Sequence, residues 1–323
     1  MSARKTGAGQ QDVVTGAFGY SGAAIARELM AVGHRVRTLT NHSAGSGSPI
    51  EARPLDFTDQ AGLVDALRGA TTLYNTYWVR FARGAVDHAV AVTNSRRLFE
   101  AASQASVQRI VHVSITHPNL SSPYPYFRGK AAVEQALGDG GIPHTILRPS
   151  VLFGGDGVLL NNIAWLLRRF PVFAIGGSGQ YRVRPIHVDD LAQLAVTAGR
   201  AQGNQVLDAV GPDRPTFIEL VRAIRTSVRS HSLLVRVPGP AIPLFATALG
   251  LVLRDRLLTT DEYRAMADGL ADTDGPPTGV TSALEWIAGN GATLGRTYAN
   301  ELDRHFRSRS DARTTARRHE PPS

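Results

Sequence analysis

A tyrosine and a lysine, Tyr126 and Lys130, stand four residues apart in the segment Pro-Tyr-Phe-Arg-Gly-Lys. On a helix, residues i and i+4 share one face, so the Lys130 ammonium would lower the pKa of the Tyr126 phenol. Such a phenol can give a proton to a carbonyl oxygen or take one from an alcohol. The lysine is informative because the chain has 33 arginines and only two lysines. An exposed helix pair without chemistry is the alternative that the spacing leaves open.

Two expected elements would position this pair. Residues 109–114 are expected to form a short apolar strand, whose last residue, Ser114, would lie at the carboxyl edge of a parallel sheet, where ligands bind. Thr116 is a second hydroxyl that could share this place, and a plain strand-end hydroxyl is the other interpretation of Ser114. Pro125 suits a helix start, which puts Tyr126 in the first turn of a helix that runs to about Leu137 and stops at the glycines that follow.

A glycine-rich turn follows the first expected strand. The segment Thr15-Gly16-Ala17-Phe18-Gly19-Tyr20-Ser21-Gly22 precedes a helix expected over residues 23–32. Gly16 would permit a tight turn, Gly19 would let the backbone approach a pyrophosphate, and Gly22 would let helix and strand pack closely. The anion would lie at the positive end of the helix. The segment predicts dinucleotide binding, although its spacing differs from the commoner Gly-x-Gly-x-x-Gly.

The second expected strand, residues 34–39, is followed by Thr40-Asn41-His42, and no acidic residue occurs before Glu51. An acid here would bind a free ribose 2′-hydroxyl, so its absence leaves room for a 2′-phosphate. We therefore expect NADP(H) to be favoured over NAD(H). Arg37 and His42 are the candidate phosphate contacts, and the alternative is that both face solvent.

The segment Pro54-Leu55-Asp56-Phe57 is expected to end a short strand and to line the adenine pocket. Asp56 can equally be a helix cap before Thr58.

Together these segments resemble the extended or atypical branch of the short-chain dehydrogenase/reductase superfamily. The resemblance covers most of residues 12–200 and includes the motifs at residues 147–154 and 187–192. It implies that Tyr126 is the acid/base, that Lys130 holds the nicotinamide ribose and lowers the pKa of Tyr126, and that Ser114 orients the substrate oxygen. The cofactor site that we assign with it comprises Thr15, Gly16, Phe18, Gly19, Tyr20, Gly22, Arg37, Asn41, Asp56, Phe57, Lys130, Pro149 and Val151.

The resemblance implies an NAD(P)-dependent oxidoreductase or epimerase/dehydratase, with hydride transfer to or from a small-molecule carbonyl or alcohol. The chain also resembles the nucleotide-binding accessory subunit of respiratory complex I. That second likeness implies the alternative, a non-catalytic NADP(H)-binding regulator or assembly subunit. The intact Tyr126 and Lys130 favour the enzyme. Two departures favour the alternative: the expected strand 72–78 ends in bulky aromatics, and Ala91 occupies the place of an asparagine of the proton relay, with Asn94 one turn away.

Other polar groups are expected to be structural. Asp189 and Asp190 precede an apolar-periodic helix and suit an N-cap, and with His187 they match no metal-ligand spacing, so no metal site is expected. The arginines at 168, 169, 182 and 184 would solvate a surface, or alternatively bind an acidic substrate group. Asn161, Asn162 and Trp165 are expected on a helix that faces the substrate pocket, although core packing would also explain Trp165.

The alternating strand and helix patterns indicate an α/β protein, and the resemblance implies a Rossmann-type doubly wound parallel sheet with a smaller C-terminal substrate domain. The chain has 323 residues and is 43% hydrophobic, enough to bury a full core. The expected parts are a flexible leader at 1–11, an NAD(P)-binding Rossmann domain at 12–210 with an insertion at about 156–182, a small substrate or cap domain at 211–303 and a disordered basic tail at 304–323.

The remaining features concern location and partners. No cysteine is present, which fits the cytoplasm, and the leader lacks the apolar core of a signal peptide. The formal charge of +8 is partly in the tail, and no nucleic-acid motif accompanies it, so we expect a small-molecule substrate and no nucleic acid. The apolar stretch 237–253 is too short to span a membrane; we expect a helix over residues 246–253, buried or on a membrane surface.

Overall fold

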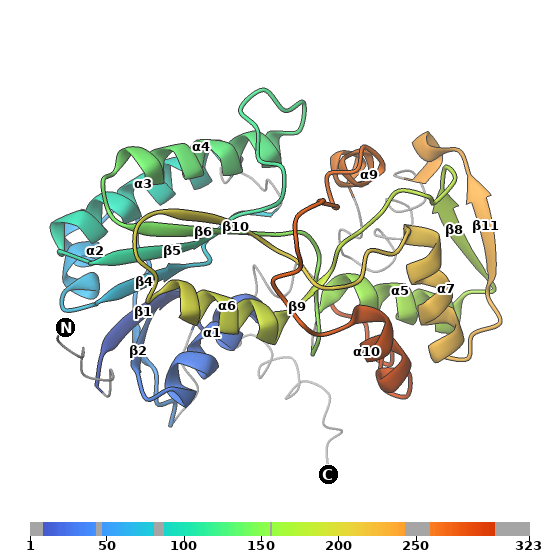
Figure 1. Ribbon diagram of the computed structural model, residues 1–323, viewed down its shortest axis with the longest axis horizontal. Coiled ribbons are helices and arrows are strands. Elements are labelled where there is room, and N and C mark those ends of the chain that lie inside the picture. The colour runs from blue at the N-terminus through green and yellow to red at the C-terminus, as the bar shows by residue number, and fades with distance from the viewer. Residues whose placement is uncertain (1–8, 43–46, 81–86, 156, 243–258, 301–323) are drawn as a thin grey trace, which may run out of the picture.

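The computed structural model describes residues 9–42, 47–80, 87–155, 157–242 and 259–300, and Figure 1 shows two lobes. Within these residues the larger lobe holds a seven-stranded sheet in the spatial order β10-β6-β5-β4-β1-β2-β3, with every neighbouring pair parallel. The order reverses direction between β1 and β4, which confirms the predicted Rossmann-type doubly wound sheet. The strands are β1 (Gln11–Thr15), β2 (Arg35–Leu39), β3 (Glu51–Arg53), β4 (Thr72–Asn75), β5 (Arg109–Val113), β6 (His144–Pro149) and β10 (Gln205–Ala209).

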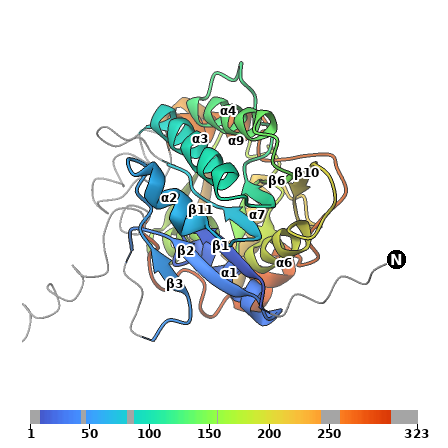
Figure 2. The same cartoon turned by 90° about the vertical axis from the view of Figure 1, so that its left-hand side faces the viewer.

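Helices cover both faces of this sheet (Figures 1 and 2). One face packs against α1 (Tyr20–Ala31) and α6 (Val188–Ala198), and the other against α2 (Gln60–Leu67), α3 (His88–Gln104) and α4 (Pro125–Asp139). Since both faces are covered, the central strands are buried along their whole length; every residue of β4 and β5 is buried. The sheet thus offers its carboxyl edge, rather than a face, to a ligand.

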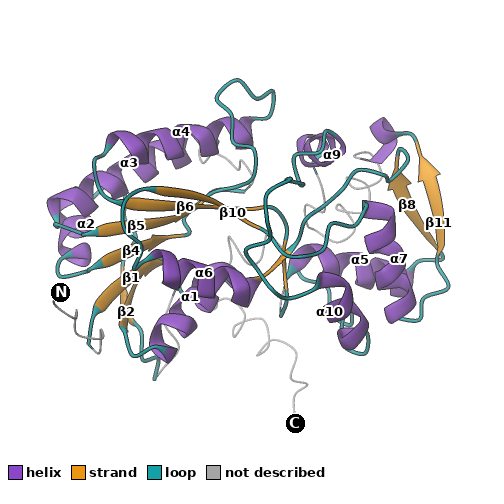
Figure 3. Cartoon of the chain, in the orientation of Figure 1, coloured by secondary structure: helices purple, strands orange, loops and turns teal. Residues whose placement is uncertain are grey.

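The smaller lobe is built from segments on both sides of β10 in the sequence (Figure 3). Its core is the cluster formed by α5, α7, α10 and the strand pair β8-β11. The predicted helix over residues 246–253, residues 1–8 of the predicted leader and the predicted tail lie outside the described residues. The elements are α5 (Val158–Arg169), β8 (Val172–Gly176), α7 (Phe217–Ser227), β11 (Leu233–Val237), the 3-10 turn η1 (Gly239–Ala241), α9 (Thr260–Ala267) and α10 (Ala283–Asn290), with the pair β7 (Leu152–Phe153) and β9 (Ile186–His187) between the lobes.

One local expectation needs correction. The N-cap of α6 is His187, not the aspartates after it, because the His187 Nδ1 accepts a hydrogen bond from the backbone N–H of Asp189. The carboxylate of Asp190 instead accepts bonds from the backbone N–H groups of Val280 and Thr281, which joins α6 to the start of α10.

Among the described residues, no helix is long and apolar enough to cross a membrane.

The glycine turn between β1 and α1 is tight for a steric reason. Gly16 has a φ of +67°, in the left-handed region that favours glycine. A Cβ at Gly22 would lie 2.2 Å from the carbonyl oxygen of Gly16 and 3.1 Å from that of Thr15. Helix α1 can therefore approach the end of β1 only because position 22 has no side chain.

Replacing Gly22 by alanine tests this packing. We expect Gly22→Ala to lower the free energy of unfolding by about 2 kcal/mol or more, because the added methyl would overlap backbone atoms that cannot move away. Gly138→Ala is the matched control: Gly138 is also helical, its Cβ would meet nothing within 4 Å, and we expect a gain of up to about 1 kcal/mol. Chemical denaturation of the three proteins measures both effects. Equal stabilities of the two variants would contradict the steric account.

Candidate active site

The site is organised around Lys130, which is 2% exposed. Its ammonium nitrogen donates a 2.9 Å hydrogen bond to the carbonyl oxygen of Val113, the last residue of β5. Because Ser114 is the next residue, this bond brings the lysine of α4 beside Ser114 at the carboxyl edge of the sheet. Two of the three predicted catalytic residues therefore lie together.

Tyr126 lies in the first turn of α4, one turn before Lys130, and is half-buried. Its ring meets the rings of Trp78 and His88 edge-on, with centroid separations of 5.6 and 5.7 Å. Trp78 also lies over Lys130, whose ammonium nitrogen is 4.6 Å from the indole centroid. Gly129 permits this approach, since a Cβ there would be 2.8 Å from the Trp78 ring. Trp78 therefore contacts both members of the Tyr-Lys pair.

Burial sets the charge state of the site. Removal from water lowers the pKa of Lys130 to about 7, and the nearby carboxylate of Glu134 offsets this effect in part. The lysine charge thus changes close to neutral pH. Burial also lowers the pKa of His88, and it lowers that of His112 together with the charge of Lys130. His112 is therefore neutral in the physiological range.

Several buried polar atoms at this edge of the sheet have no hydrogen-bond partner among the described residues. They are Ser114 Oγ, Trp78 Nε1, His88 Nδ1 and His112 Nε2. Buried polar groups are normally paired, so these orphan atoms, two of which belong to rings that contact Tyr126, indicate a place where a ligand binds.

A buried hydrogen-bond chain fixes the strand ends beneath the site. Thr15 Oγ1 donates to Asn75 Oδ1 at 3.1 Å, and the amide of Asn75 lies 3.1 Å from Nδ1 of His112. Thr15 Oγ1 also accepts from the backbone N–H groups of Thr76 and Tyr77. The Thr15 hydroxyl, predicted to bind cofactor, is thus engaged within the protein and aligns β1, β4 and β5 instead.

The start of α1 has the properties of an anion site. Its N-cap, Gly19, makes no side-chain capping bond, and the first turn contains no acidic residue. The backbone N–H groups of a helix start attract phosphate. Tyr20 donates its hydroxyl to the carbonyl oxygen of Gly154 at 2.7 Å, which connects the turn with the loop after β7. Phe18 continues the turn without a side-chain contact that would fix its role.

The predicted adenine-end residues are placed differently. The guanidinium of Arg37 is bound to Glu51 and to the carbonyl oxygens of Ala66 and Arg68 at the C-terminal end of α2, so the structure corrects its assignment as a phosphate contact. Asp56 accepts from the backbone and hydroxyl of Thr58, and the N-cap of α2 is Asp59, so Asp56 is not the helix cap considered as its alternative.

Asn41, Phe57 and His42 remain near the carboxyl end of β2. Asn41 exchanges two hydrogen bonds with the backbone of Leu55, and Phe57 packs on Tyr77 at 4.6 Å between ring centroids. His42 is exposed.

The residues after β6 are fixed through their backbones. The carbonyl oxygens of Pro149 and Val151 accept from Thr116 and Ile186. The hydroxyl of Thr116 donates to Leu270 O at 2.7 Å and cannot at the same time replace Ser114. Asn94, considered as a relay residue, donates to the hydroxyl of Tyr77 at 2.9 Å.

The expected pocket helix is used for internal packing. Asn161 bonds Thr297 O and Gly295 N, and Asn162 bonds both the N–H and the carbonyl of Ala299. Trp165 packs on Tyr298 with centroids 5.1 Å apart. These side chains hold the 295–299 segment on α5, and the contact of Trp165 with Tyr298 fits the alternative that Trp165 packs internally.

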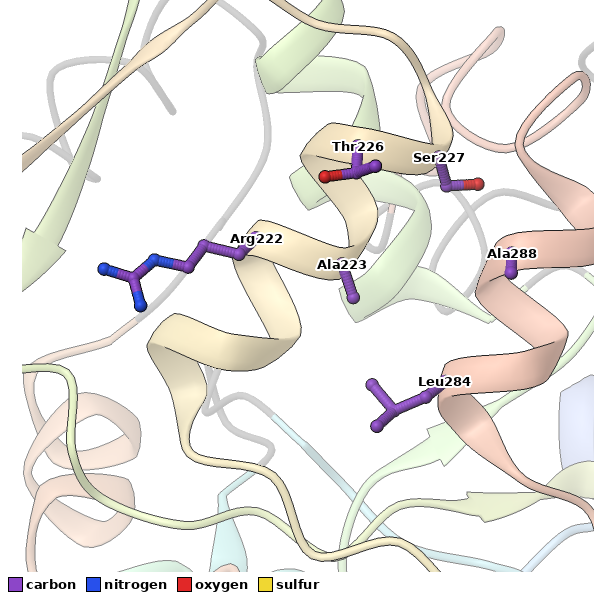
Figure 4. A pocket seen from close by; sticks show the side chains of 6 residues that line it. All are labelled: Arg222, Ala223, Thr226, Ser227, Leu284 and Ala288. Carbon is purple, nitrogen blue, oxygen red and sulfur yellow. The ribbon is translucent and has the colours of Figure 1, made fainter.

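A separate groove lies between α7 and α10 in the smaller lobe (Figure 4). Arg222 extends away from α10 there, and the hydroxyl of Ser227 is already bonded to Ile287 O. The groove brings no acid/base pair together. It is lined by Arg222, Ala223, Thr226, Ser227, Leu284 and Ala288. In the described part of the chain, no cluster of His, Asp or Glu is arranged to hold a metal ion.

The sequence interpretation missed His88 and His112. His112 could have been found, because it is two residues before Ser114 and alternate residues of a strand share a face. His88 reaches Tyr126 only through the packing of α3 on α4, and no spacing in the sequence signals it.

The NAD dependent epimerase/dehydratase family matches this chain over residues 13–208. NADH dehydrogenase (ubiquinone) 1 alpha subcomplex subunit 9 of Arabidopsis thaliana is 27% identical over 143 residues, which cover 43% of this chain and 36% of the relative. The chain spans about a third or less of the length of the first curated relatives.

Two solved structures have the same fold over most of the chain. The triphenylmethane reductase of Citrobacter sp. in complex with NADP(H) has a TM-score of 0.70 and 19% identity, and covers 87% of this chain and 99% of its own. The NADPH-dependent quinone oxidoreductase of Escherichia coli with NADPH has a TM-score of 0.70 and 21% identity, with the same coverage of 87% and 99%.

Replacing Lys130 by methionine tests the burial of its charge. The folded-state pKa of about 7 lies below the unfolded value of 10.5, so protonation favours the unfolded chain between these values. Relative to the native protein, Lys130→Met should therefore gain stability as the pH falls from 10 to 7, by about 1.4 kcal/mol per pH unit, and gain no more below 7. Denaturant unfolding at several pH values measures this. A pH-independent difference would contradict the assignment.

Proposed function

Because the chain belongs to the NAD-dependent epimerase/dehydratase family, we propose that it is an NAD(P)-dependent oxidoreductase acting on a small-molecule carbonyl or alcohol, with Tyr126 as acid/base. The observation that carries this proposal is the hydrogen bond from Lys130 to Val113 O. It holds an ammonium one helical turn from the phenol and beside the unpartnered hydroxyl of Ser114.

The described residues fit a nicotinamide dinucleotide. The turn from Gly16 to Gly22 presents backbone without side chains at a helix start, and the orphan Ser114 hydroxyl faces no protein partner. The turn would hold the pyrophosphate, and Lys130 would hold the nicotinamide ribose.

In reduction, Tyr126 gives its hydroxyl proton to the carbonyl oxygen while Ser114 holds that oxygen. A nicotinamide held by Lys130 and the glycine turn would supply the hydride that the carbonyl carbon needs. A carbonyl, NAD(P)H and a proton thus yield an alcohol and NAD(P)⁺, and solvent returns the proton to Tyr126. The Lys130 ammonium stabilises the phenolate that Tyr126 passes through. The reverse reaction uses the same groups.

NADP(H) is our proposed cofactor. The segment after β2 contains no acid that would bind a ribose 2′-hydroxyl, and the exposed His42 lies there. Arg37 does not support NADP(H) binding, because Glu51 and α2 bind its guanidinium.

The second candidate is a non-catalytic NADP(H)-binding subunit. Trp78 lies over the Lys130 ammonium, and it is one of the bulky aromatic residues after β4 that favour this candidate. The similarity to subunit 9 of the Arabidopsis NADH dehydrogenase supports the same candidate. Turnover of NADPH by the native protein decides between the oxidoreductase and the non-catalytic subunit.

Tyr126→Phe separates these candidates. We expect the variant to bind NADPH within about twofold of the native affinity and to lose about 10²- to 10⁴-fold in kcat, because the ring stays while the transferable proton is gone. Fluorescence titration with NADPH and NADPH oxidation with a carbonyl panel measure both quantities. Tyr77→Phe is the control: the native Tyr77 hydroxyl accepts a hydrogen bond from Asn94, and the variant that lacks it should keep its turnover. Binding without turnover in the native protein would support the non-catalytic subunit.

His42→Asp tests the cofactor preference. A carboxylate at the end of β2 would repel a 2′-phosphate and could accept from a 2′-hydroxyl, so NADPH affinity should fall by about tenfold while NADH affinity stays or rises. His42→Asn is the uncharged control. Native affinities that are equal for the two cofactors, or unchanged ratios in His42→Asp, would be inconsistent with NADP(H) preference.

A further inference from the structure

The space around Tyr126 is walled by aromatic and apolar side chains. The rings of Trp78 and His88 stack on each other, 3° from parallel. Each of the two rings makes an edge-on contact with the Tyr126 ring. On its other side Tyr126 packs with a cluster containing Tyr124, Phe127 and Ala265. Flat rings placed this way attract a further ring edge-on or offset.

Helix α9 and the segment after it close this wall. The hydroxyl of Tyr124 donates to Asp268, Thr116 donates to Leu270 O, and Ser150 donates to Ala271 O. These bonds run from the sheet edge and α4 to a single segment of the smaller lobe. The apolar wall is therefore held in place beside Tyr126.

The polar side chains that would recognise a charged diphosphate are already engaged. Arg184 is buried and donates to the carbonyl oxygens of Gly211, Thr273 and Gly275. Arg168 donates to the carbonyl oxygens of Gly291 and Leu294. Arg214 is paired with two aspartates, and Asn161 and Asn162 hold the 295–299 segment. Releasing Arg184 or Arg168 would leave backbone carbonyl oxygens without a partner, and releasing Arg214 would leave two carboxylates without theirs.

The charges near the wall also oppose one another. Arg80 is paired with Glu262, and the guanidinium of Arg128 donates to Ser122 O. The charge of Asp261 raises the pKa of both His88 and Tyr124. The charge of Arg264 lowers the pKa of Tyr124 and so opposes the effects of Asp268 and Asp261. The positive charge of Lys130, one helical turn from Tyr126, has the carboxylate of Glu134 nearby.

We propose that this site takes an uncharged aromatic carbonyl compound, with its ring against Trp78 and its oxygen at Tyr126, rather than a nucleotide sugar. The indole N–H of Trp78 is buried without a partner, and an indole can only donate, so it suits a carbonyl oxygen. This inference rests on the proposed function. It adds the substrate class and makes Trp78 the residue that sets specificity.

Matched ligands that differ only in aromaticity test the proposal. Calorimetry on the NADP⁺-loaded protein would compare benzamide, cyclohexanecarboxamide and UDP-glucose, and NADPH oxidation with benzaldehyde would follow turnover. We expect benzamide to bind up to about tenfold more tightly than cyclohexanecarboxamide, since aromatic pairs add to area burial, and UDP-glucose to bind more weakly than either. In Trp78→Leu the benzamide preference should fall to about one, because the aromatic partner is removed.

Trp165→Leu is the matched control, because Trp165 packs on Tyr298 in the smaller lobe, and its preference ratio should stay native. A preference for the cyclohexane compound or UDP-glucose, binding of none of the three, or a native ratio in Trp78→Leu overturns the inference. Failure of NADPH itself to bind, measured by fluorescence, would instead overturn the proposed function. The two failures are therefore distinguishable.

Discussion

The hydrogen bond between the buried Lys130 ammonium and the carbonyl oxygen of Val113 is the contact on which the site depends. It fixes α4 over the end of β5, so the phenol of Tyr126 and the hydroxyl of Ser114 are held at one edge of the sheet. Burial makes this arrangement costly, since it lowers the lysine pKa to about 7. Trp78 offsets part of that cost by placing its ring over the ammonium.

The rest of the fold supplies rigid surroundings for this contact. Thr15, Asn75 and His112 align the ends of three neighbouring strands below the site, and the missing side chain of Gly22 brings α1 close to β1. The smaller lobe uses its arginines and asparagines to bind its own backbone. Among the described residues, the buried polar atoms without a partner include nitrogens of Trp78 and His88, whose rings contact Tyr126, and the Ser114 hydroxyl at the same edge of the sheet, where a ligand can satisfy them.

The sequence predicted the parts of this arrangement that depend on local spacing. The Tyr126-Lys130 pair, the proline before it and the glycine turn specify short-range geometry, and the apolar run predicts the strand to Ser114, one residue beyond the observed end of β5. The partners of Arg37, Asn161 and Asn162 could not be predicted, because each bonds a segment distant in the sequence. The same holds for Trp78 and His88, whose contacts with Tyr126 exist only after α3 packs on α4.

The central claim is that Lys130 is a buried ammonium whose charge changes near neutral pH. Because the chain has only one other lysine, Lys5, NMR of protein labelled with ¹³C at lysine Cε follows Lys130 directly, and Lys130→Arg identifies its signal. The account predicts that this signal titrates at about pH 7. Titration of the Lys130 signal at the ordinary lysine value, about 10.4, would contradict it.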